Sequence, residues 1–380
     1  MEKLQTILLN FLIFFALLGL CLVLPPIALK VLGFGQMVFP VSGSNTDARA
    51  LLPAYEKSSW AEKHFEEFAS LKTDYKDYFV WRRRDFRGET INIVDGLRTT
   101  AQPRGTLNTN EYWFFGGSTT WGTGVNDENT YPSVFAADAM QFVRNFGESG
   151  YIAAQSLFFL QAEVLLTERF DLSGVTVVFL DGVNDVASRC RVQSEGLGSS
   201  REYLIASRMS DRASRYSFAQ TFAQLSDFLS AVRRRLANNG KRDSLLAEGY
   251  DCHTNSIRAQ EIASSLVATW MLANDVVESR GGTFYGVLQP VSFQSRQANR
   301  SEIFEGAHND LLAKQFSSVY PLIQTELRKQ KAPHLINLIS VFDDCSTCYI
   351  DFAHFGPKGS ELIAAELLER VHTKPPSDDQ

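Results

Sequence analysis

The chain has no excess of basic residues. Its 37 Lys and Arg residues are outnumbered by 43 Asp and Glu residues, which gives a formal net charge of −6. Proteins that bind nucleic acid carry a basic surface that neutralises phosphates, so nucleic acid is not expected as a partner. The length of 380 residues is enough for one large domain or two small ones with a sizeable core.

Clusters of metal-binding residues are also missing from the sequence. Cys345 and Cys348 have the spacing of a redox or metal motif, but no second cysteine pair and no group of histidines accompanies them. We therefore expect no metal and no other cofactor. Cys21 lies in an apolar run, which leaves an even number of cysteines. We favour structural disulfides between Cys345 and Cys348 and between Cys190 and Cys252, formed in an oxidising compartment; four unrelated buried thiols are the alternative.

No charged residue occurs between Leu4 and Leu29. An apolar stretch of this length can cross a bilayer as a helix. A cleaved signal peptide would have a shorter apolar run and a small-x-small cleavage site, and no convincing Ala-x-Ala site is present. We therefore expect a single transmembrane anchor at residues 4–29, with a cleaved signal peptide as the alternative. Lysines flank both ends of the run, so the expected extracytoplasmic (periplasmic) side rests on the expected disulfides.

Buried-strand patterns alternate with amphipathic helices in most of the remaining chain. The expected strands are 112–115, 142–143, 175–180, 283–288 and 334–339, and the expected helices include 59–78, 153–166, 258–277 and 359–371. A short β-like run at 90–94, followed by a turn at 95–96, precedes them. This alternation predicts a doubly wound, flavodoxin-like parallel sheet in an α/β/α sandwich. The expected domain organisation is a stalk and pre-domain at 30–108, a catalytic domain at 109–373 with a helical insertion at about 187–278, and a disordered tail at 374–380.

An arginine-rich segment at 82–87 precedes the catalytic domain. It could bind anionic lipid head groups or an acidic polysaccharide. Charge runs are more often solvated faces, and Glu66, Glu67 and Asp85 are available as local carboxylate partners. We therefore favour a solvated face.

Four short segments contain the residue types of an acyl-transfer site. They are Gly-Gly-Ser-Thr at 116–119, Asn-Phe-Gly-Glu-Ser-Gly at 145–150, Gly-Val-Asn-Asp at 182–185 and Asp-Phe-Ala-His at 351–354. The first three each follow an expected strand, and the carboxyl ends of parallel strands meet at one edge of a sheet. Each residue alone also fits a structural role, such as helix capping by Ser118 or Asn184. Together they predict one site at this edge.

The chemistry of that site follows from what serine needs. A serine hydroxyl becomes a useful nucleophile only when a base takes its proton, and His354 is the candidate base for Ser118. Asp351 would accept a hydrogen bond from the other imidazole nitrogen and fix the orientation of the ring. The remaining histidines lack such a context and are expected to be structural or solvated: His64, His253, His308, His334 and His372.

In their order and spacing the four segments resemble blocks I, II, III and V of the SGNH (GDSL-like) hydrolase family. The resemblance implies that the Ser118 amide, the Gly150 amide and the Asn184 side chain hold the oxyanion of the tetrahedral intermediate. Block I departs from the family pattern, because Gly-Gly-Ser-Thr stands where Gly-Asp-Ser-Leu is usual. Similar variation occurs among membrane-associated members, including alginate-acetylation proteins, and it leaves the substrate class open.

The sequence thus predicts a membrane-anchored, extracytoplasmic serine esterase that removes a small acyl group, most simply acetyl, from a carbohydrate. The family resemblance supplies the carbohydrate, since no sugar-binding signature is visible. The alternatives are a polysaccharide O-acetyltransferase that uses the same site, a lipid-directed esterase or thioesterase, and an inactive polysaccharide-binding module. A polysaccharide-modification assembly is a candidate partner.

Overall fold

The computed structural model of the chain describes residues 47–103, 110–192, 194, 249–296 and 307–372. These residues belong to a unit that begins at Asp47. The expected anchor at 4–29 and the expected tail at 374–380 lie outside the described residues. Within the described ranges, no helix is long and apolar enough to span a membrane.

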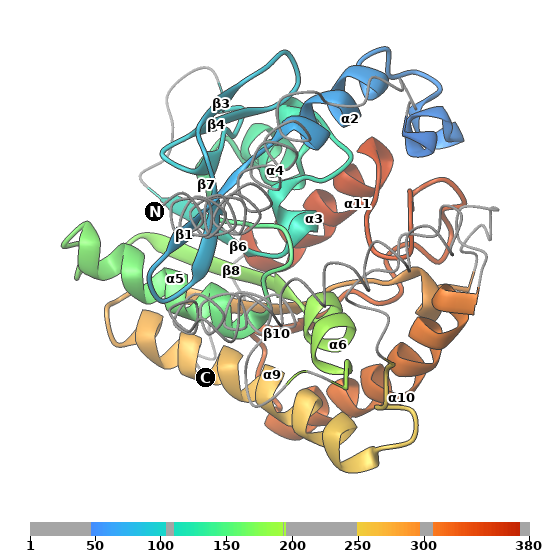
Figure 1. Cartoon of the computed structure of the whole chain (residues 1–380). Coiled ribbons are helices and arrows are strands. Elements are labelled where there is room, and N and C mark those ends of the chain that lie inside the picture. Colours follow the sequence, from blue (N-terminus) through green and yellow to red (C-terminus); the bar gives the residue numbers. More distant parts are fainter. Residues whose placement is uncertain (1–46, 104–109, 193, 195–248, 297–306, 373–380) are drawn as a thin grey trace, which may run out of the picture. The chain divides into compact units, whose positions relative to one another are not determined.

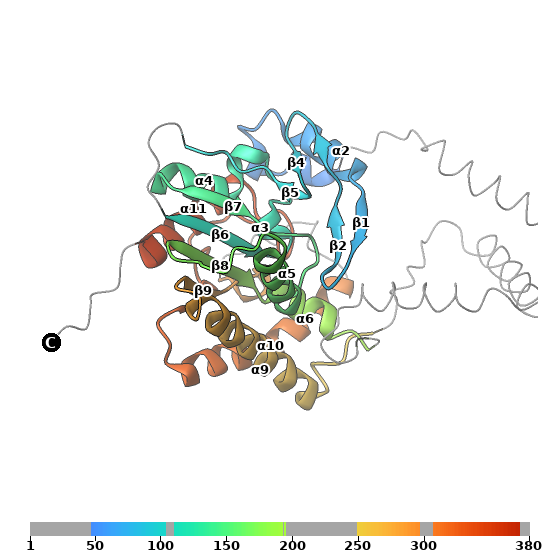
Figure 2. The same ribbon diagram turned by 90° about the vertical axis from the view of Figure 1, so that its left-hand side faces the viewer.

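An eight-stranded sheet organises the described residues, in the order β10-β9-β8-β6-β7-β5-β4-β3. Its parallel part consists of β6 (Glu111–Gly116), β7 (Phe142–Asn145), β8 (Val175–Asp181), β9 (Thr283–Leu288) and β10 (Leu335–Asn337). Figure 2 shows β7, β6, β8 and β9 side by side in this order. The first strand of this part in the chain, β6, lies between the second and the third, which is the flavodoxin-like arrangement. The expected α/β fold with a mostly parallel sheet is confirmed.

Three short strands extend the sheet beyond β7 in antiparallel fashion. They are β3 (Phe86–Arg87), β4 (Asn92–Val94) and β5 (Leu97–Arg98). The domain boundary expected at residue 109 therefore falls between β5 and β6, two strands of one sheet.

Helices cover both faces of the parallel strands because side chains along each strand alternate in direction. On β6, Trp113 and Phe115 pack in the same buried cluster as α5 (Ala153–Leu166) and α9 (Ser256–Glu278). Tyr112 and Phe114 point to the other face, where they share a cluster with α4 (Tyr131–Ala139) and α11 (Pro357–Leu367). Another long helix, α10 (Ala307–Gln330), packs against α9 (Figure 1).

Shorter elements connect these parts. They are η1 (Ala48–Leu51), η2 (Pro53–Tyr55), α2 (Ala61–Ser70), β1 (Thr73–Lys76), β2 (Val80–Arg83), α3 (Ser118–Trp121), η3 (Asp127–Asn129), α6 (Val183–Arg189), η4 (Ser292–Gln294) and η6 (Leu368–His372).

The helix expected at 59–78 is wrong in its second half. It ends at Ser70, and β1 follows and pairs with β2, with Tyr75 opposite Trp81. Tyr75 fits the helical spacing, but its side chain is exposed while Trp81 is buried. The cross-strand pairing therefore prevails over the local periodicity.

Both expected disulfides are present, Cys190–Cys252 and Cys345–Cys348. The first joins the end of α6 to the residues before α9. In the region of the expected insertion, α9 connects β8 to β9 as a layer of the sandwich. Residues 195–248, which make up most of the expected insertion, lie outside the described part of the chain.

Candidate active site

Ser118 is the first residue of α3, at the turn directly after β6, the strand at which the order of the sheet reverses. Figure 1 shows α3 beside β6. Ligands of open α/β sheets bind at this switch point. The turn needs its two glycines for different reasons. Gly116 has φ +148°, a backbone conformation that favours glycine. A Cβ atom on Gly117 would collide with the side-chain amide nitrogen of Asn184, so the absence of a side chain lets this amide approach the serine turn.

Ser118, His354 and Asp351 lie in one hydrogen-bonded series. The Ser118 Oγ is 2.6 Å from the His354 Nε2, although 236 positions separate the two residues in the chain. The His354 Nδ1 is 2.7 Å from one carboxylate oxygen of Asp351 and 2.8 Å from the other. With the proton on Nδ1, this geometry leaves Nε2 free to accept the hydroxyl proton of the serine. The structure thus brings together the three residues that the sequence proposes as nucleophile, base and orienting carboxylate.

The carboxylate of Asp351 is held by several donors. Its Oδ1 accepts hydrogen bonds from the backbone N–H groups of Ala353 and His354, at 3.0 and 2.8 Å. Its Oδ2 accepts one from the Nη1 of Arg49, at 3.1 Å. Burial by itself raises the pKa of Asp351, but the attraction and hydrogen bond of His354, together with the two backbone N–H groups, outweigh it and hold this pKa well below its ordinary value. Asp351 is therefore ionised at neutral pH.

The expected oxyanion donors come from the ends of three neighbouring strands. Ser118 follows β6, Gly150 lies between β7 and α5, and Asn184 lies in the first turn of α6 after β8. The Asn184 Nδ2 donates to the carbonyl of Tyr151 at 2.8 Å, which fixes the amide beside the serine turn. Within the described ranges, the backbone N–H groups of Ser118 and Gly150 donate to no other backbone carbonyl. The arrangement therefore offers two backbone donors and one side-chain donor.

The arginine-rich segment at 82–87 is not the solvated face that the sequence suggested. Arg82 and Arg83 are 3% and 8% exposed. The Arg82 Nη1 donates to the Phe146 carbonyl at 3.1 Å. Arg84 and Arg87 fit the expectation, since both are exposed, and Arg84 forms an exposed ion pair with Asp74. A run of like charges gives no sign that the side chains of Arg82 and Arg83 are buried, because their hydrogen-bond partners lie in another segment.

That other segment is the loop that carries Gly150. Glu148 is completely buried and accepts hydrogen bonds from the Arg83 backbone N–H and Nη1 at 2.8 and 2.5 Å, and from the Ser149 N–H at 2.7 Å. The Trp81 Nε1 donates to the Ser149 carbonyl at 3.1 Å. Two residues of β2, Trp81 and Arg83, thus hold the loop between β7 and α5 in place at Ser149 and Glu148.

Among the side chains that the structure describes, no other histidine belongs to this series. His64 is fully buried, and its Nε2 accepts a hydrogen bond from the Gly124 N–H at 3.1 Å. Burial lowers the pKa of His64 well below its ordinary value, so His64 is a neutral structural residue. His253 pairs with Gln315, and the side chains of His308 and His372 are outside the described part of the structure.

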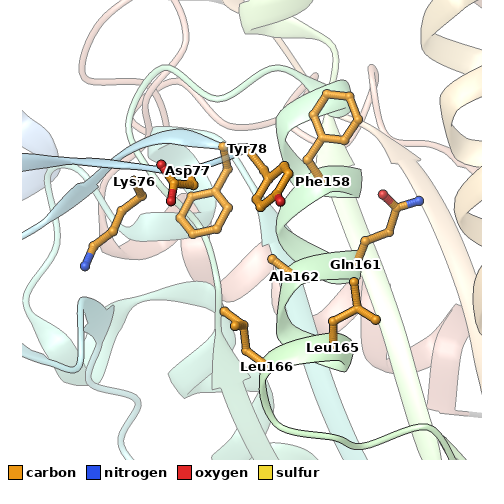
Figure 3. A pocket seen from close by; sticks show the side chains of 9 residues that line it. Lys76, Asp77, Tyr78, Phe158, Gln161, Ala162, Leu165 and Leu166 are labelled. Atoms are coloured by element: carbon orange, nitrogen blue, oxygen red, sulfur yellow. The ribbon is translucent and has the colours of Figure 1, made fainter.

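A separate pocket of about 510 Å³ lies between the β1–β2 turn and α5. Apolar side chains dominate its lining, among them Tyr78, Phe158, Leu165 and Leu166 (Figure 3). No serine or histidine lines it, so it is distinct from the series described above. Among the described residues there is also no group of three or more His, Cys, Asp or Glu side chains that could hold a metal ion.

Comparisons with known proteins yield similarities only among solved structures. No family model matches the chain, and no curated protein matches it. It is similar to a lipolytic protein of the G-D-S-L family from Veillonella parvula (11% identity, 70% of this chain and 100% of that one, TM-score 0.39). It is also similar to a putative arylesterase from Agrobacterium tumefaciens (14%, 70% and 99%, TM-score 0.38) and to Est24, a carbohydrate acetylesterase from Sinorhizobium meliloti (13%, 70% and 99%, TM-score 0.36). At these identities and TM-scores, the assignment of a reaction rests on the site itself.

Proposed function

We propose that the protein is a serine esterase of the SGNH type, with Ser118 as nucleophile, His354 as general base and Asp351 as the carboxylate that orients the base. The observation that carries this proposal is the continuous series of hydrogen bonds from Ser118 Oγ through the imidazole of His354 to Asp351. Its position at the reversal point of the sheet and the resemblance of the four segments to the family blocks support it.

The proposed reaction has two halves. In the first, the Ser118 Oγ attacks the ester carbonyl carbon while its proton passes to the His354 Nε2. The negative charge that develops on the carbonyl oxygen is held by the Ser118 and Gly150 amides and by Asn184. The C–O bond of the ester then breaks, and the leaving alkoxide takes the proton from His354. In the second half, His354 activates a water molecule, which releases the acid and restores the serine.

We further propose that the ester is a small acyl ester of a carbohydrate, acetyl in the simplest case, met on the extracytoplasmic side of the membrane to which residues 4–29 would anchor the chain. The family resemblance supports a carbohydrate as the substrate, and the two disulfides support the compartment. If a sugar hydroxyl replaces water in the second half, the same residues perform O-acetyl transfer.

The test of the chemistry uses the full chain in detergent with p-nitrophenyl acetate, beside Ser118→Ala and His354→Ala. We expect both variants to fall to the background rate, because each removes a group on which the others depend. A serine-reactive phosphonate is expected to label Ser118 in the wild type. Equal rates in all three proteins, with no labelling of Ser118, would falsify the proposal.

The test of the acceptor supplies an acetylated oligosaccharide in water and then adds an unacetylated oligosaccharide in excess. Release of free acetate at a rate that the added sugar does not change is expected for an esterase. Transfer of acetyl to the added sugar, with slow release of acetate, would instead assign the protein as an O-acetyltransferase.

A further inference from the structure

We infer that Arg49 is a positioning residue for the catalytic carboxylate, so that the segment at 47–55 forms part of the active site. The inference rests on the proposed function, because it assigns Arg49 a role that acts through Asp351. The first observation is the contact itself. The Arg49 Nη1 donates to the Asp351 Oδ2 at 3.1 Å across 302 positions of the chain, and the two side chains are 21% and 19% exposed. A pair this shielded from water is weakened less by salt than a surface pair.

The guanidinium of Arg49 is itself held in place. Its Nε and Nη2 donate to the two carboxylate oxygens of Asp47, at 3.1 and 2.9 Å. This is the bidentate fork that gives an arginine–carboxylate pair its directionality. The ring of Phe65 lies 4.7 Å from the guanidinium carbon, within range of a cation–π contact. Two nitrogens are thus fixed by Asp47, and the third points at Asp351.

Arg49 gives the Oδ2 of Asp351 a hydrogen-bond donor that the backbone of the catalytic loop does not provide. The Oδ1 of Asp351 has two backbone donors from its own loop, Ala353 and His354. Within the described part of the chain, Oδ2 has only the His354 ring and Arg49 as donors. Arg49 therefore opposes rotation of the carboxylate about its Cβ–Cγ bond and keeps Oδ2 in line with Nδ1. It also lies between two carboxylates, Asp47 and Asp351, and neutralises their mutual repulsion.

The segment that bears Arg49 is seated on the catalytic loop. Ala50 and Tyr55 belong to the same buried cluster as Ile350, the residue before the catalytic carboxylate. The Tyr55 hydroxyl donates to the Gly124 carbonyl at 2.6 Å, in the stretch that follows α3. The position of Arg49 is therefore determined by buried packing on both the nucleophile side and the base side of the site.

The experiment compares Arg49→Gln, Arg49→Lys and Asp47→Asn with the wild type, all as full chains in detergent on p-nitrophenyl acetate. The matched control is Arg84→Gln, which removes an arginine from an exposed ion pair with Asp74. We expect Arg49→Gln to lower kcat by about 10- to 100-fold with KM nearly unchanged, because small displacements of a catalytic group cost up to about 100-fold. Phosphonate labelling of Ser118 is expected to slow in parallel.

The two remaining variants separate positioning from a general structural effect. Arg49→Lys keeps the charge and is expected to recover part of the lost kcat. Asp47→Asn keeps Arg49 but loosens its fork, and a smaller loss of kcat than in Arg49→Gln is expected. If Arg49→Gln does not fold, the kcat of Asp47→Asn still tests the inference. Arg84→Gln is expected to match the wild type.

Wild-type kcat in both Arg49→Gln and Asp47→Asn would overturn the inference while leaving the esterase proposal intact. A loss of kcat that Arg49→Lys does not reduce at all, with melting temperatures lowered in proportion, would overturn it in favour of a structural role. An inactive, unlabelled wild type would overturn the proposed function and this inference together.

Discussion

At the scale of single residues, Asn184 offers the clearest separation of binding from catalysis. We expect Asn184→Ala to lower kcat by about 100- to 1000-fold with little change in KM, the usual cost of losing one oxyanion donor. Asn92→Ala is the control, because it removes an amide that is also half-buried and is bonded to Asp127 instead. Steady-state kinetics on p-nitrophenyl acetate decide the question, and a wild-type kcat in Asn184→Ala would exclude Asn184 from the oxyanion site.

Asp351 carries a prediction about pH. Its folded-state pKa lies below the ordinary value, so ionised Asp351 contributes stability that is fully present above about pH 4 and is lost as the pH falls toward the folded-state pKa. We therefore expect Asp351→Asn to be less stable than the wild type at pH 7, with a gap that narrows at pH 3. It should also lower kcat by about 10⁴-fold. Urea unfolding at the two pH values measures the gap, and a gap of constant size would contradict the assignment.

The sequence predicts the residues of the triad and not the residues that hold it. The triad residues lie in short segments whose residue types indicate an acyl-transfer site: Ser118, Asp351 and His354. Arg49 has no such signal, because its partner is 302 positions away and one arginine after an aspartate is unremarkable in a sequence. A single contact between two distant loops produces no repeating pattern in the sequence, so the sequence does not predict it.

At the scale of elements, the ion pair between Arg83 on β2 and Glu148 in the loop after β7 is the contact with the largest expected effect. Removing one partner of a buried pair leaves an uncompensated charge, so we expect Arg83→Met to cost about 3–5 kcal/mol of unfolding free energy. The double variant Arg83→Met, Glu148→Leu should recover most of it, because both charges are then gone.

The exposed neighbour provides the control for this pair. Arg84→Met breaks a surface ion pair and is expected to change the stability by less than about 1 kcal/mol. Urea unfolding of the wild type, Arg83→Met, Arg84→Met and the double variant gives the change in unfolding free energy of each variant. A double variant no more stable than Arg83→Met would show that the destabilisation comes from lost packing rather than from the buried charge.

Elements with strong periodicity were predictable almost to the residue. The helix expected at 153–166 is α5, and the strand expected at 283–288 is β9. Each has a run of apolar residues that is mostly buried, although Phe158, Leu165 and Leu166 of α5 are exposed. The stretch after Ser70 was not predictable in this way. Tyr75, which continues the helical spacing, is exposed, and the strand β1 forms because it pairs with β2, which follows it in the chain.

At the scale of the whole molecule, residues 47–103 cannot be separated from the parallel sheet that carries the site. Trp81 is buried in the main core, and Ile91 and Ile93 are buried against Trp121, which follows the nucleophile turn. A protein that begins at residue 110 would lose these partners and three strands of the sheet. We expect it to be insoluble or to lack a cooperative thermal transition, and to remain unlabelled by the phosphonate.

The comparison is a protein that begins at residue 47, which we expect to melt cooperatively and to react with the phosphonate at Ser118. Thermal melts and labelling of the two truncated proteins side by side provide the measurement. A cooperative, labelled protein from residue 110 onward would show that the first strands are dispensable to the site.

The parallel sheet and the gathering of the site at one edge were predictable at this scale, because both follow from the alternation of strands and helices. The continuation of the sheet into β3, β4 and β5 was not. The β-like run at 90–94 contains β4, but β3 and β5 are only two residues long and show no alternating pattern. Nothing in these short segments indicates that β5 pairs with β7.

The pairing of Cys190 with Cys252 has a consequence for protein engineering. The Cα atoms of the two cysteines are 5.2 Å apart, and just inside them the Val192 N–H donates to the Gly249 carbonyl at 3.0 Å. The two described ends that flank residues 195–248 are therefore held together by the disulfide and by this hydrogen bond. We therefore expect a short glycine-rich turn, spliced between these two ends in place of residues 195–248, to leave the register of the described strands unchanged.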